Sequence, residues 1–373
     1  MPETAVLPTT KKRDLATTIV KKLRKAGHEA YFVGGCVRDE ALGIVPKDFD
    51  IATSAKPQQV MKLFKKTVPV GVQFGVVLVA EHREHFEVAT FRSDGEYIDS
   101  RRPKEVHFSD AKEDVLRRDF TINGLLCDPV TGKIMDYVGG LQDLRDKVLR
   151  TIGDPRKRFK EDKLRLIRAI RFACRFGFAL DAQTLEAIRA SADQISKVSQ
   201  ERIRDELVKI ITGQNVGRAL DLLRETGLLV QILPEVEKMV GVQQPPEFHP
   251  EGDVYVHTKL LFEQLSHPSA VLAFGALLHD VGKPDTFKVA ERIRFDGHVE
   301  VGVELADKIL RRLRFPNQER KQVMQLVETH MKFKDVRQMR ENRLKRFLQS
   351  EIFQEELEMH RVDCLASHGM LDN

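Results

Sequence analysis

Hydrophobic and polar residues in the first part of the chain alternate in short runs typical of strands, separated by turns and short helical segments. Strands are predicted at 31–33, 76–79 and 86–89, and helices at 11–25, 36–42 and 58–64. The pair Gly34-Gly35 turns the first strand into the helix that follows it. This mixture predicts an α/β head with a mixed β-sheet over residues 1–140.

After Leu141 the apolar residues recur with the period of an α-helix. Amphipathic runs cover 158–176, 181–192, 200–211 and 216–226. Pro245-Pro246 and the stretch that follows to Gly252 are typical of a linker, and a further helical block begins near Val256. We therefore predict two all-α parts behind the head, a helical neck and body over 141–245 and an α-helical domain over 246–373.

Composition limits the class of protein more than it indicates a function. The chain has 373 residues, 42% hydrophobic and 31% charged, which suits two or three packed modules. No apolar stretch approaches the ~20 residues that cross a bilayer, and the start lacks the apolar core of a secretory signal, so a cytoplasmic location without membrane contact is expected. The four cysteines are scattered without a Cys-x-x-Cys pair, which favours neither disulfides nor a thiolate zinc site. The net charge of +5 suits an acidic partner without identifying one.

Two carboxylates separated by one residue are the first candidates for chemistry. In Asp48-Phe49-Asp50 both acidic side chains fall on the same side of an extended strand, because side chains alternate faces with a period of two. In-line phosphoryl transfer needs two hard cations bridged by carboxylates, and Glu87 on a later strand can supply a third ligand. The Gly34-Gly35 turn can hold a triphosphate on its backbone N–H groups. Taken alone, a surface loop and an ordinary strand-to-helix turn remain open as explanations.

These residues belong to an ordered series of motifs that resembles the nucleotidyltransferase core of bacterial tRNA CCA-adding enzymes and poly(A) polymerases. The resemblance extends from about Tyr31 to Phe178 and implies a nucleotidyltransferase fold for the head. Its segments are VGGCVRD at 33–39, KDFDIAT at 47–53, EVATFR at 87–92, RRDFTINGL at 117–125, DYVGG at 136–140 and EDKLR at 161–165.

The resemblance implies a role for each motif. Asp48 and Asp50 inherit the ligands of a two-Mg²⁺ site, and Glu87 is the third catalytic carboxylate. The residues assigned to the incoming nucleotide are Gly34, Gly35, Arg38, Arg118, Asp119 and Asn123. The chemistry agrees, because a carboxylate accepts a hydrogen bond from a ribose 2′-hydroxyl and a guanidinium pairs with phosphate.

A second nucleotide-binding group lies in the helical run that follows. Family members use the Asp and Arg of the EDKLR motif as a protein template, which implies that Asp162 and Arg165 select the base. A carboxylate accepts from the amino group of cytosine or adenine while Arg donates to the ring nitrogen, whereas guanine and uracil present a carbonyl instead. Arg168 and Arg171, further along the same helix, are expected to bind nucleotide or to line the path of the RNA. An ordinary salt bridge on a helix face is the alternative.

The implied reaction is template-independent addition of C and A, as CCA or part of it, to the 3′ end of tRNA. CTP and ATP are the implied nucleotide sources, pyrophosphate is released, and the tRNA acceptor stem is the expected partner. The stretch 94–103 resembles the flexible loop that family members use to add the terminal A, which disfavours CC-only addition. Val72-Gln73 departs from the basic signature of poly(A) polymerases. A-only addition, poly(A) synthesis and a non-catalytic RNA-binding scaffold stay open as alternatives.

Histidines gather in the last third of the chain, where seven of the 12 lie beyond residue 250. His279-Asp280-Val281-Gly282-Lys283-Pro284 resembles the motif of HD-domain metal-dependent phosphohydrolases. The resemblance implies a metal site with the ligands His257, His279, Asp280 and Asp363. A second ion could bind at His298 and His330. The ligands suit Mn²⁺, Ni²⁺, Fe²⁺ or Zn²⁺ without choosing among them.

Two further alternatives concern this C-terminal block. In the first, hydrolysis of phosphate esters at the histidine site is the main activity of the protein and the head is vestigial. The chain ends at Asn373, soon after Asp363, whereas family members with this module usually continue, so we expect either a truncated chain or a short form.

Overall fold

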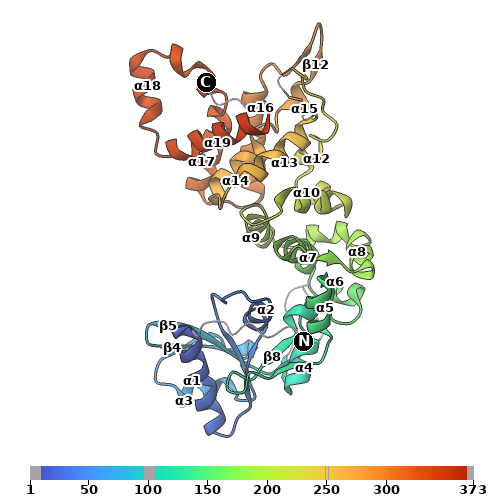
Figure 1. Cartoon of the computed structure of the whole chain (residues 1–373), viewed down its shortest axis with the longest axis vertical. Helices are drawn as coiled ribbons and strands as arrows, with labels where there is room; N and C mark the ends of the chain where they lie inside the picture. Colours follow the sequence, from blue (N-terminus) through green and yellow to red (C-terminus); the bar gives the residue numbers. More distant parts are fainter. Residues whose placement is uncertain (1–9, 96–105, 248, 251, 368–373) are drawn as a thin grey trace. The chain divides into compact units, whose positions relative to one another are not determined.

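A computed structural model describes residues 10–95, 106–247, 249–250 and 252–367 (Figure 1). The chain divides into two compact units, one of Met1–Arg165 with Phe178–Ala187 and the other of Leu166–Gly177 with Ile188–Asn373. A mixed β-sheet lies in the first unit and helices make up nearly all of the second, which confirms the predicted fold class. Within the described part, none of the helices is both long and apolar enough to cross a membrane.

A seven-stranded sheet forms the framework of the first unit. Its strands lie in the order β3-β4-β5-β2-β1-β8-β9. β2 and β5 pair in parallel with Ile51 opposite Val88, while the other neighbours pair antiparallel. The strands are β1 (Ala30–Val33), β2 (Asp50–Thr53), β3 (Thr67–Gly71), β4 (Val76–Glu81), β5 (Glu84–Thr90), β8 (Leu125–Cys127) and β9 (Ile134–Asp136).

Helices cover the sheet close to the positions that the hydrophobic period predicts. α1 (Lys11–Lys25) packs on β1 and β2, α3 (Pro57–Leu63) on β4 and β5, and α2 (Gly35–Ala41) on β1 and β8. Val33, Ala52 and Leu126, from three adjacent strands, form a buried cluster with Val115 of α4 (Ala111–Leu116). This cluster fixes the central strands from which the acidic side chains project.

The DYVGG motif has a structural role in the first unit. Asp136 accepts hydrogen bonds from the backbone N–H groups of residues 138–141 and so caps the start of α5 (Gly140–Asp146). A β-carbon at Gly140 would lie 2.2 Å from the Thr121 carbonyl oxygen, which no side chain tolerates. The motif therefore ties α5 to the backbone of the 117–125 motif.

Short elements complete the first unit. They are η1 (Val72–Phe74), β6 (Arg92–Asp94), β7 (Val106–Phe108), η2 (Thr121–Asn123), β10 (Val148–Leu149), α6 (Pro155–Glu161), β11 (Ala179–Leu180) and α8 (Ala182–Arg189). β6 and β7 pair antiparallel. Most of the stretch that resembles the A-adding loop, residues 96–103, lies outside the described residues.

Helices make up the second unit apart from one short hairpin. The chain enters it along α7 (Leu164–Phe176) and continues through η3 (Ala192–Lys197), α9 (Gln200–Ile211), α10 (Val216–Glu225), α11 (Leu228–Ile232) and α12 (Pro234–Glu237). The C-terminal part contains α13 (Val254–Gln264), α14 (Ala270–Leu278), α15 (Lys283–Thr286), β12 (Lys288–Val289), β13 (Ile293–Arg294), α16 (His298–Arg312), α17 (Asn317–Thr329), η4 (Lys332–Gln338), α18 (Glu341–Leu348) and α19 (Phe353–Ala366). α14 is buried from Val271 to Leu278 and packs on α17, so it forms the centre of this core.

The prediction of one helix over 158–176 is wrong. α6 ends at Glu161 and α7 begins at Leu164, with Asp162 extended between them at φ −137° and ψ 106°. Asp162 Oδ1 accepts a hydrogen bond from the Leu164 N–H at 3.1 Å, so this side chain caps the second helix instead of continuing the first. Hydrophobic periodicity continues across such a break and does not reveal it.

Candidate active site and metal centre

Carboxylates from two adjacent strands meet in the head. The register of the parallel pair β2 and β5 puts Asp50 beside Glu87. Burial and the negative charge of Glu87 raise the pKa of Asp50 to about 6. Arg118 acts in the opposite direction, and Asp48 adds to the repulsion. Negative charge is thus concentrated at one point of the sheet, as is typical of functional sites.

Asp48 joins this group from the loop before β2, because the strand begins only at Asp50. The predicted alternation is present, since Phe49 between the two acids is buried while Asp48 is exposed. Lys12 of α1 donates to Asp48 Oδ1 at 2.7 Å and lies 3.5 Å from Glu84 Oε2. The ammonium group of Lys12 therefore neutralises the more exposed of the two acids.

The glycine turn lies against Arg118. Gly34 has φ +74° and ψ −126°, which a side chain would strain, and a β-carbon there would lie 3.1 Å from Arg118 Nη1. Asp114, 1% exposed, accepts from Arg118 Nη2 at 3.0 Å and from Arg117 Nη2 at 2.6 Å. Burial acts to raise the pKa of Asp114, but the two arginines hold it below its ordinary value. Sequence reasoning missed Asp114, because it precedes Arg117 and Arg118 by three and four residues, the spacing of any charged pair on a helix.

Three of the predicted nucleotide-binding residues form one chain of hydrogen bonds. Arg38, only 4% exposed, donates to Asn123 Oδ1 at 2.5 Å and to Asp39 Oδ1 at 2.8 Å. Asn123 Nδ2 donates in turn to Asp119 Oδ1 at 3.0 Å. Arg38 is therefore placed to orient Asn123, and Asn123 to orient Asp119.

Asp162 lies in the break between α6 and α7, and Arg165 belongs to α7, so the two residues do not share the face of one continuous helix. Arg165 donates to Glu161 Oε2 at 2.7 Å and to the backbone oxygens of Arg158 and Arg117 at 3.2 and 3.1 Å. These bonds fix a guanidinium whose side chain is 9% exposed. The ion pair of Arg165 is with Glu161.

Arg168 and Arg171 of α7 converge on one buried carboxylate. Arg171 Nε lies 2.6 Å from Glu206 Oε2, and Arg168 Nη1 lies 3.8 Å from Glu206 Oε1. Arg171 also lies over the Phe172 ring, 4.1 Å from its centroid. Sequence reasoning missed Glu206, which is 2% exposed and belongs to a separate helix, α9.

The C-terminal helical part gathers all six predicted metal ligands in one place. Two groups of three side chains have potential ligand atoms within 4.8 Å of one another, namely His257, His279 and Asp280, and then Asp280, His298 and His330. Asp363 lies beside the first group, with Oδ1 2.9 Å from His257 Nε2 and 3.9 Å from His279 Nε2. Asp280 belongs to both groups, which is the position of a carboxylate that bridges two ions.

Helix ends prepare three of these histidines for a metal. His279 and His330 follow the last turns of α14 and α17, and His298 is the first residue of α16. Each donates its Nδ1–H to a carbonyl oxygen three residues earlier, at 3.0, 2.7 and 2.9 Å respectively. In the neutral ring this bond leaves Nε2 with its lone pair. All three Nε2 atoms are buried without a well-aligned hydrogen-bond partner among the described residues, although His279 Nε2 lies 3.1 Å from Asp280 Oδ2. Buried lone pairs of this kind fit a metal ion.

Burial and neighbouring charges determine the protonation of several side chains in the cluster. Burial lowers the pKa of His330 to about 4, so its ring is neutral at pH 7. Burial acts to raise the pKa of Asp280, but His279 and Lys283 hold it well below its ordinary range. Lys283 Nζ lies 2.6 Å from Asp280 Oδ2 and donates to Gln244 Oε1 at 2.6 Å. A neutral imidazole beside an ionised carboxylate is what metal binding requires.

Gly282 lets two elements of this centre approach closely. A β-carbon there would lie 2.1 Å from the His298 carbonyl oxygen and 2.6 Å from the Gly302 nitrogen. Its φ of −82° is open to any residue, so packing rather than backbone conformation requires the glycine. A side chain at position 282 would push His298 away from Asp280.

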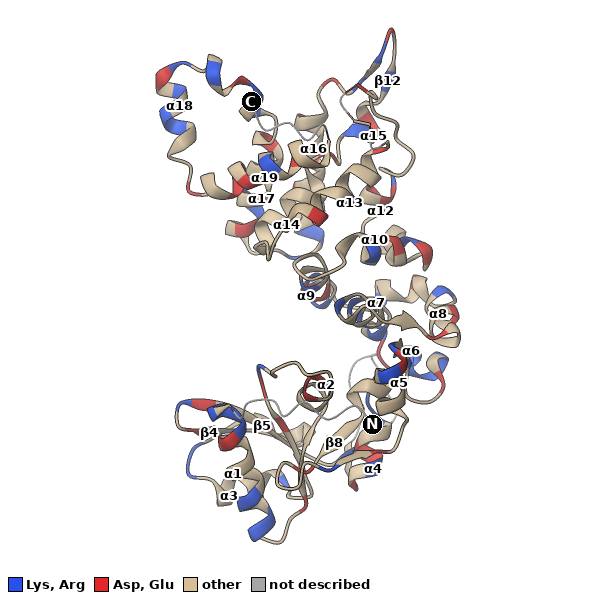
Figure 2. Ribbon diagram, viewed as in Figure 1, with Lys and Arg blue, Asp and Glu red and all other residues tan. Residues whose placement is uncertain are grey.

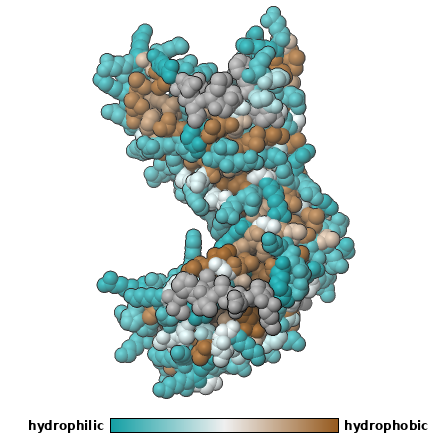
Figure 3. Space-filling model, in the orientation of Figure 1, coloured by the Kyte–Doolittle hydropathy of each residue, from teal (hydrophilic) through white to brown (hydrophobic). Residues whose placement is uncertain are grey.

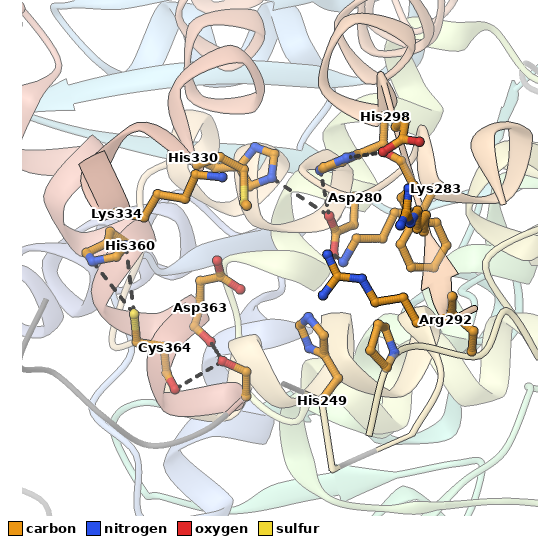
Figure 4. A pocket seen from close by; sticks show the side chains of 17 residues that line it. His249, Asp280, Lys283, Arg292, His298, His330, Lys334, His360, Asp363 and Cys364 are labelled. Carbon is orange, nitrogen blue, oxygen red and sulfur yellow. Dashed lines mark hydrogen bonds and ion pairs between the residues drawn. The ribbon is translucent and has the colours of Figure 1, made fainter. Parts of the chain in front are cut away.

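A cavity of about 700 Å³ opens onto the cluster. In Figure 4 the His298 and His330 rings point toward Asp280, and Asp363 lies close by. Basic side chains on the wall suit an anionic phosphate ester, and they are Lys283, Arg292, Arg294 and Lys334.

Sequence reasoning missed the contact of Lys283 with Asp280, although this lysine directly follows the His-Asp-Val-Gly motif. It also missed His249, whose ring lies 4.9 Å from that of His257 and whose position in a predicted linker gave no signal.

The head has the architecture of a nucleotidyltransferase, and the histidine centre has that of an HD domain. Family comparisons assign the same classes in the same order. The poly(A) polymerase head domain matches residues 30–150, a domain described as the probable RNA and SrmB-binding site of polymerase A matches 177–239, and the HD domain matches 253–366. Both the first and the last of these domains generally use divalent metal ions.

Individual relatives agree with these matches. The CCA-adding enzymes of Anoxybacillus flavithermus and Bacillus pumilus are 45% and 47% identical over 222 and 224 residues, or 59% and 60% of this chain. The chain covers only 55% and 56% of them, little more than half their length. The crystal structure of the Bacillus stearothermophilus CCA-adding enzyme in complex with CTP is 30% identical with a TM-score of 0.69, covering 96% of this chain and 78% of that one. The chain therefore belongs to the family of CCA-adding enzymes and poly(A) polymerases.

Proposed function

We propose that the chain adds C and A nucleotides, as CCA or part of it, to the 3′ end of tRNA in the cytoplasm, using CTP and ATP and releasing pyrophosphate. The cluster of Asp48, Asp50 and Glu87 beside the Gly34 turn carries this proposal. In-line phosphoryl transfer needs ionised oxygen ligands for metal next to a triphosphate site. Similarity to CCA-adding enzymes, one of them solved with CTP, supports the choice of substrate.

The three carboxylates fit two Mg²⁺ ions, because hard cations prefer carboxylate oxygens and the strand register brings Asp50 beside Glu87, with Asp48 close by. Bound there, the ions supply activation of the RNA 3′-hydroxyl and charge neutralisation at the leaving pyrophosphate. Asp50 and Glu87 hold their positions through strand pairing, whereas Asp48 approaches from a loop.

The residues around the glycine turn would bind the incoming nucleotide. Arg118, held by Asp114 against Gly34, is placed to pair with a phosphate that enters the turn beside Gly35. Asp119 can accept from the ribose 2′-hydroxyl, and Asn123 fixes its orientation. Arg38 would act indirectly through Asn123.

The product can be tested with tRNAs that end before the first C, after one C and after two C residues. Each is incubated with the purified chain and each NTP, and the 3′ ends are sequenced. We expect CTP to be used on the first two substrates and ATP on the third. Addition of A alone to the third would indicate an A-only enzyme, and long A tracts on any RNA would indicate a poly(A) polymerase.

We propose further that Asp162 and Arg165 choose the base, through the carboxylate and guanidinium pattern that cytosine and adenine match. Asp162→Ala should reduce the preference for CTP over UTP roughly 10- to 100-fold, because a hydrogen bond to a charged group contributes about 1.5–3 kcal/mol. Single-turnover incorporation of the four NTPs measures the ratios.

Asp154→Ala is the matched control for this variant. Asp154 also caps a helix with its side chain, accepting from the Arg156 N–H at 2.9 Å at the start of α6. The Asp154→Ala variant should be destabilised to a similar degree as Asp162→Ala, and its incorporation ratios for the four NTPs should be unchanged. Equal ratios in both variants would mean that Asp162 serves only as a cap.

A second activity is favoured by the three buried imidazole nitrogens that converge on Asp280 in the HD centre. We propose that one transition-metal ion binds His257, His279, Asp280 and Asp363, and that His298 and His330 share Asp280 around a second ion. The basic cavity would take a phosphate ester for hydrolysis. Mn²⁺, Ni²⁺, Fe²⁺ and Zn²⁺ all suit these ligands, so hydrolysis of a 2′,3′-cyclic phosphate should be assayed with each ion. No turnover with any of them would contradict the proposal.

A further inference from the structure

One short segment of the HD domain carries charge equal to the net charge of the whole chain. Residues 332–346 contain seven Lys or Arg and two Asp or Glu, a formal charge of +5, and the net charge of the 373 residues is also +5. The remaining sequence is therefore balanced. Such a concentration marks an electrostatic surface for a polyanion more clearly than the total charge does.

The fold displays this charge on an exposed helix. The segment comprises η4 and most of α18, and α18 has no buried residue. Figure 2 shows Lys and Arg along α18. Phe347 of α18 packs inward on Phe333 and Phe353, with ring centroids 4.9 and 5.8 Å away. The aromatic side of the helix is thus used within the protein, whereas a helix that binds a membrane would present it to lipid.

A groove of about 500 Å³ lies between α17 and α18. Four cations line it, Lys321 from α17, Lys332 from η4, and Arg343 and Arg346 from α18, together with two carboxylates, Glu328 and Glu356. Lys332 pairs with Glu328 at 3.2 Å, but Lys321, Arg343 and Arg346 have no carboxylate partner within the described part of the chain. These three are available to a ligand.

The groove also offers an apolar wall. Met324 and Phe347 contribute to its lining, and Figure 3 shows hydrophobic surface between the positions of α17 and α18 with hydrophilic surface around it. Unpaired cations that line a groove suit the phosphates of a nucleic-acid backbone.

We propose that η4, α18 and this groove form an RNA-binding surface that contacts phosphates of the substrate RNA. It lies within the HD domain match at 253–366 and outside the RNA-binding match at 177–239. The identity of that RNA as tRNA rests on the proposed function. The binding itself depends only on the charge and the groove.

The test replaces Lys321, Arg340, Arg343 and Arg346 by Gln in the full chain. Binding to a tRNA transcript without its terminal CCA is measured by fluorescence anisotropy over a range of salt concentrations. We expect affinity to fall at least tenfold at low salt and the salt slope to shrink by about 2 to 4, because each phosphate contact contributes about 0.9 to that slope. Replacing the three arginines by Lys should retain the slope, since the charge is kept.

The matched control replaces four exposed lysines of the head by Gln, namely Lys21, Lys25, Lys62 and Lys65. It removes the same total charge and should alter affinity less than threefold. Equal losses of RNA affinity in the groove variant and in the head control, or unchanged RNA affinity in the groove variant, would overturn the proposal. A groove variant that loses binding to anionic vesicles but keeps binding to RNA would overturn it as well. If the wild-type chain adds no nucleotide yet the first variant still loses affinity, only the proposed function fails.

Discussion

Replacing Asp48 and Asp50 together by alanine should abolish nucleotide incorporation, with a loss on the order of 10³-fold or more. Metal ions in such a site contribute several kcal/mol to transition-state stabilisation, and each factor of ten in rate corresponds to about 1.36 kcal/mol. tRNA affinity should be retained. Incorporation of labelled CTP into a tRNA lacking CCA measures the rate, and anisotropy measures the affinity.

Stability provides an independent check on this variant. Asp50 is an acid whose charge is disfavoured by burial and by Glu87, so its removal should leave the unfolding temperature unchanged or raise it. Asp14→Ala with Asp146→Ala removes two carboxylates outside the cluster and should leave incorporation unaffected. Normal incorporation by the Asp48 and Asp50 variant would exclude the two-metal site. An unfolding temperature clearly below that of the wild type would contradict the account of Asp50 as an acid whose charge is disfavoured in the fold.

Asp280→Asn should remove metal from the HD centre and stop phosphoester hydrolysis while nucleotide addition continues. Asp280 belongs to both groups of ligands, so one substitution affects both ions. Asparagine keeps the shape of the side chain and leaves Lys283 a hydrogen-bond acceptor, so the fold should survive. Calorimetry with Mn²⁺ or Ni²⁺ measures binding, where we expect a loss on the order of 100-fold or more, in line with the cost of losing a group that organises a metal site.

Asp296→Asn is the matched control for the metal centre. Asp296 lines the same cavity but belongs to neither ligand group. Metal affinity should be unchanged in this variant, and hydrolysis should change only slightly. If Asp280→Asn lowered nucleotide addition as strongly as hydrolysis, the two activities would not be separable in the way proposed.

Elements with a clear hydrophobic period were predictable from the sequence, and the break at Asp162 was not. The helices at 11–25 and 200–211 agree with α1 and α9, because burial of one face dictates their spacing. Leu164, Ile167 and Leu166 continue the apolar pattern across the junction of α6 and α7, so periodicity gave no sign of the cap that Asp162 supplies. A local hydrogen bond decided the backbone there, against the pattern of burial.

Functional residues were predictable where a motif specifies them, and their supporting partners were not. The six predicted ligands of the HD centre lie together, yet no pattern in the sequence indicated that three of them donate Nδ1–H to carbonyls at helix ends. Asp114 and Glu206, which hold candidate arginines, are buried carboxylates that look like ordinary surface acids in the sequence. Burial, a property of the whole fold, distinguishes them.

The parallel pairing of β2 with β5 also determines when the head can acquire its chemistry during folding. Asp50 and Glu87 become neighbours only after α3, β3 and β4, which lie between them in the chain, have folded back. Contacts across such a separation form late, because the loop must close before they are made. A slip of one residue would exchange Glu87 for Phe86 or Val88, and burial of those two side chains forbids it. The two carboxylates of the proposed metal site are therefore brought together only once this strand pairing is in register.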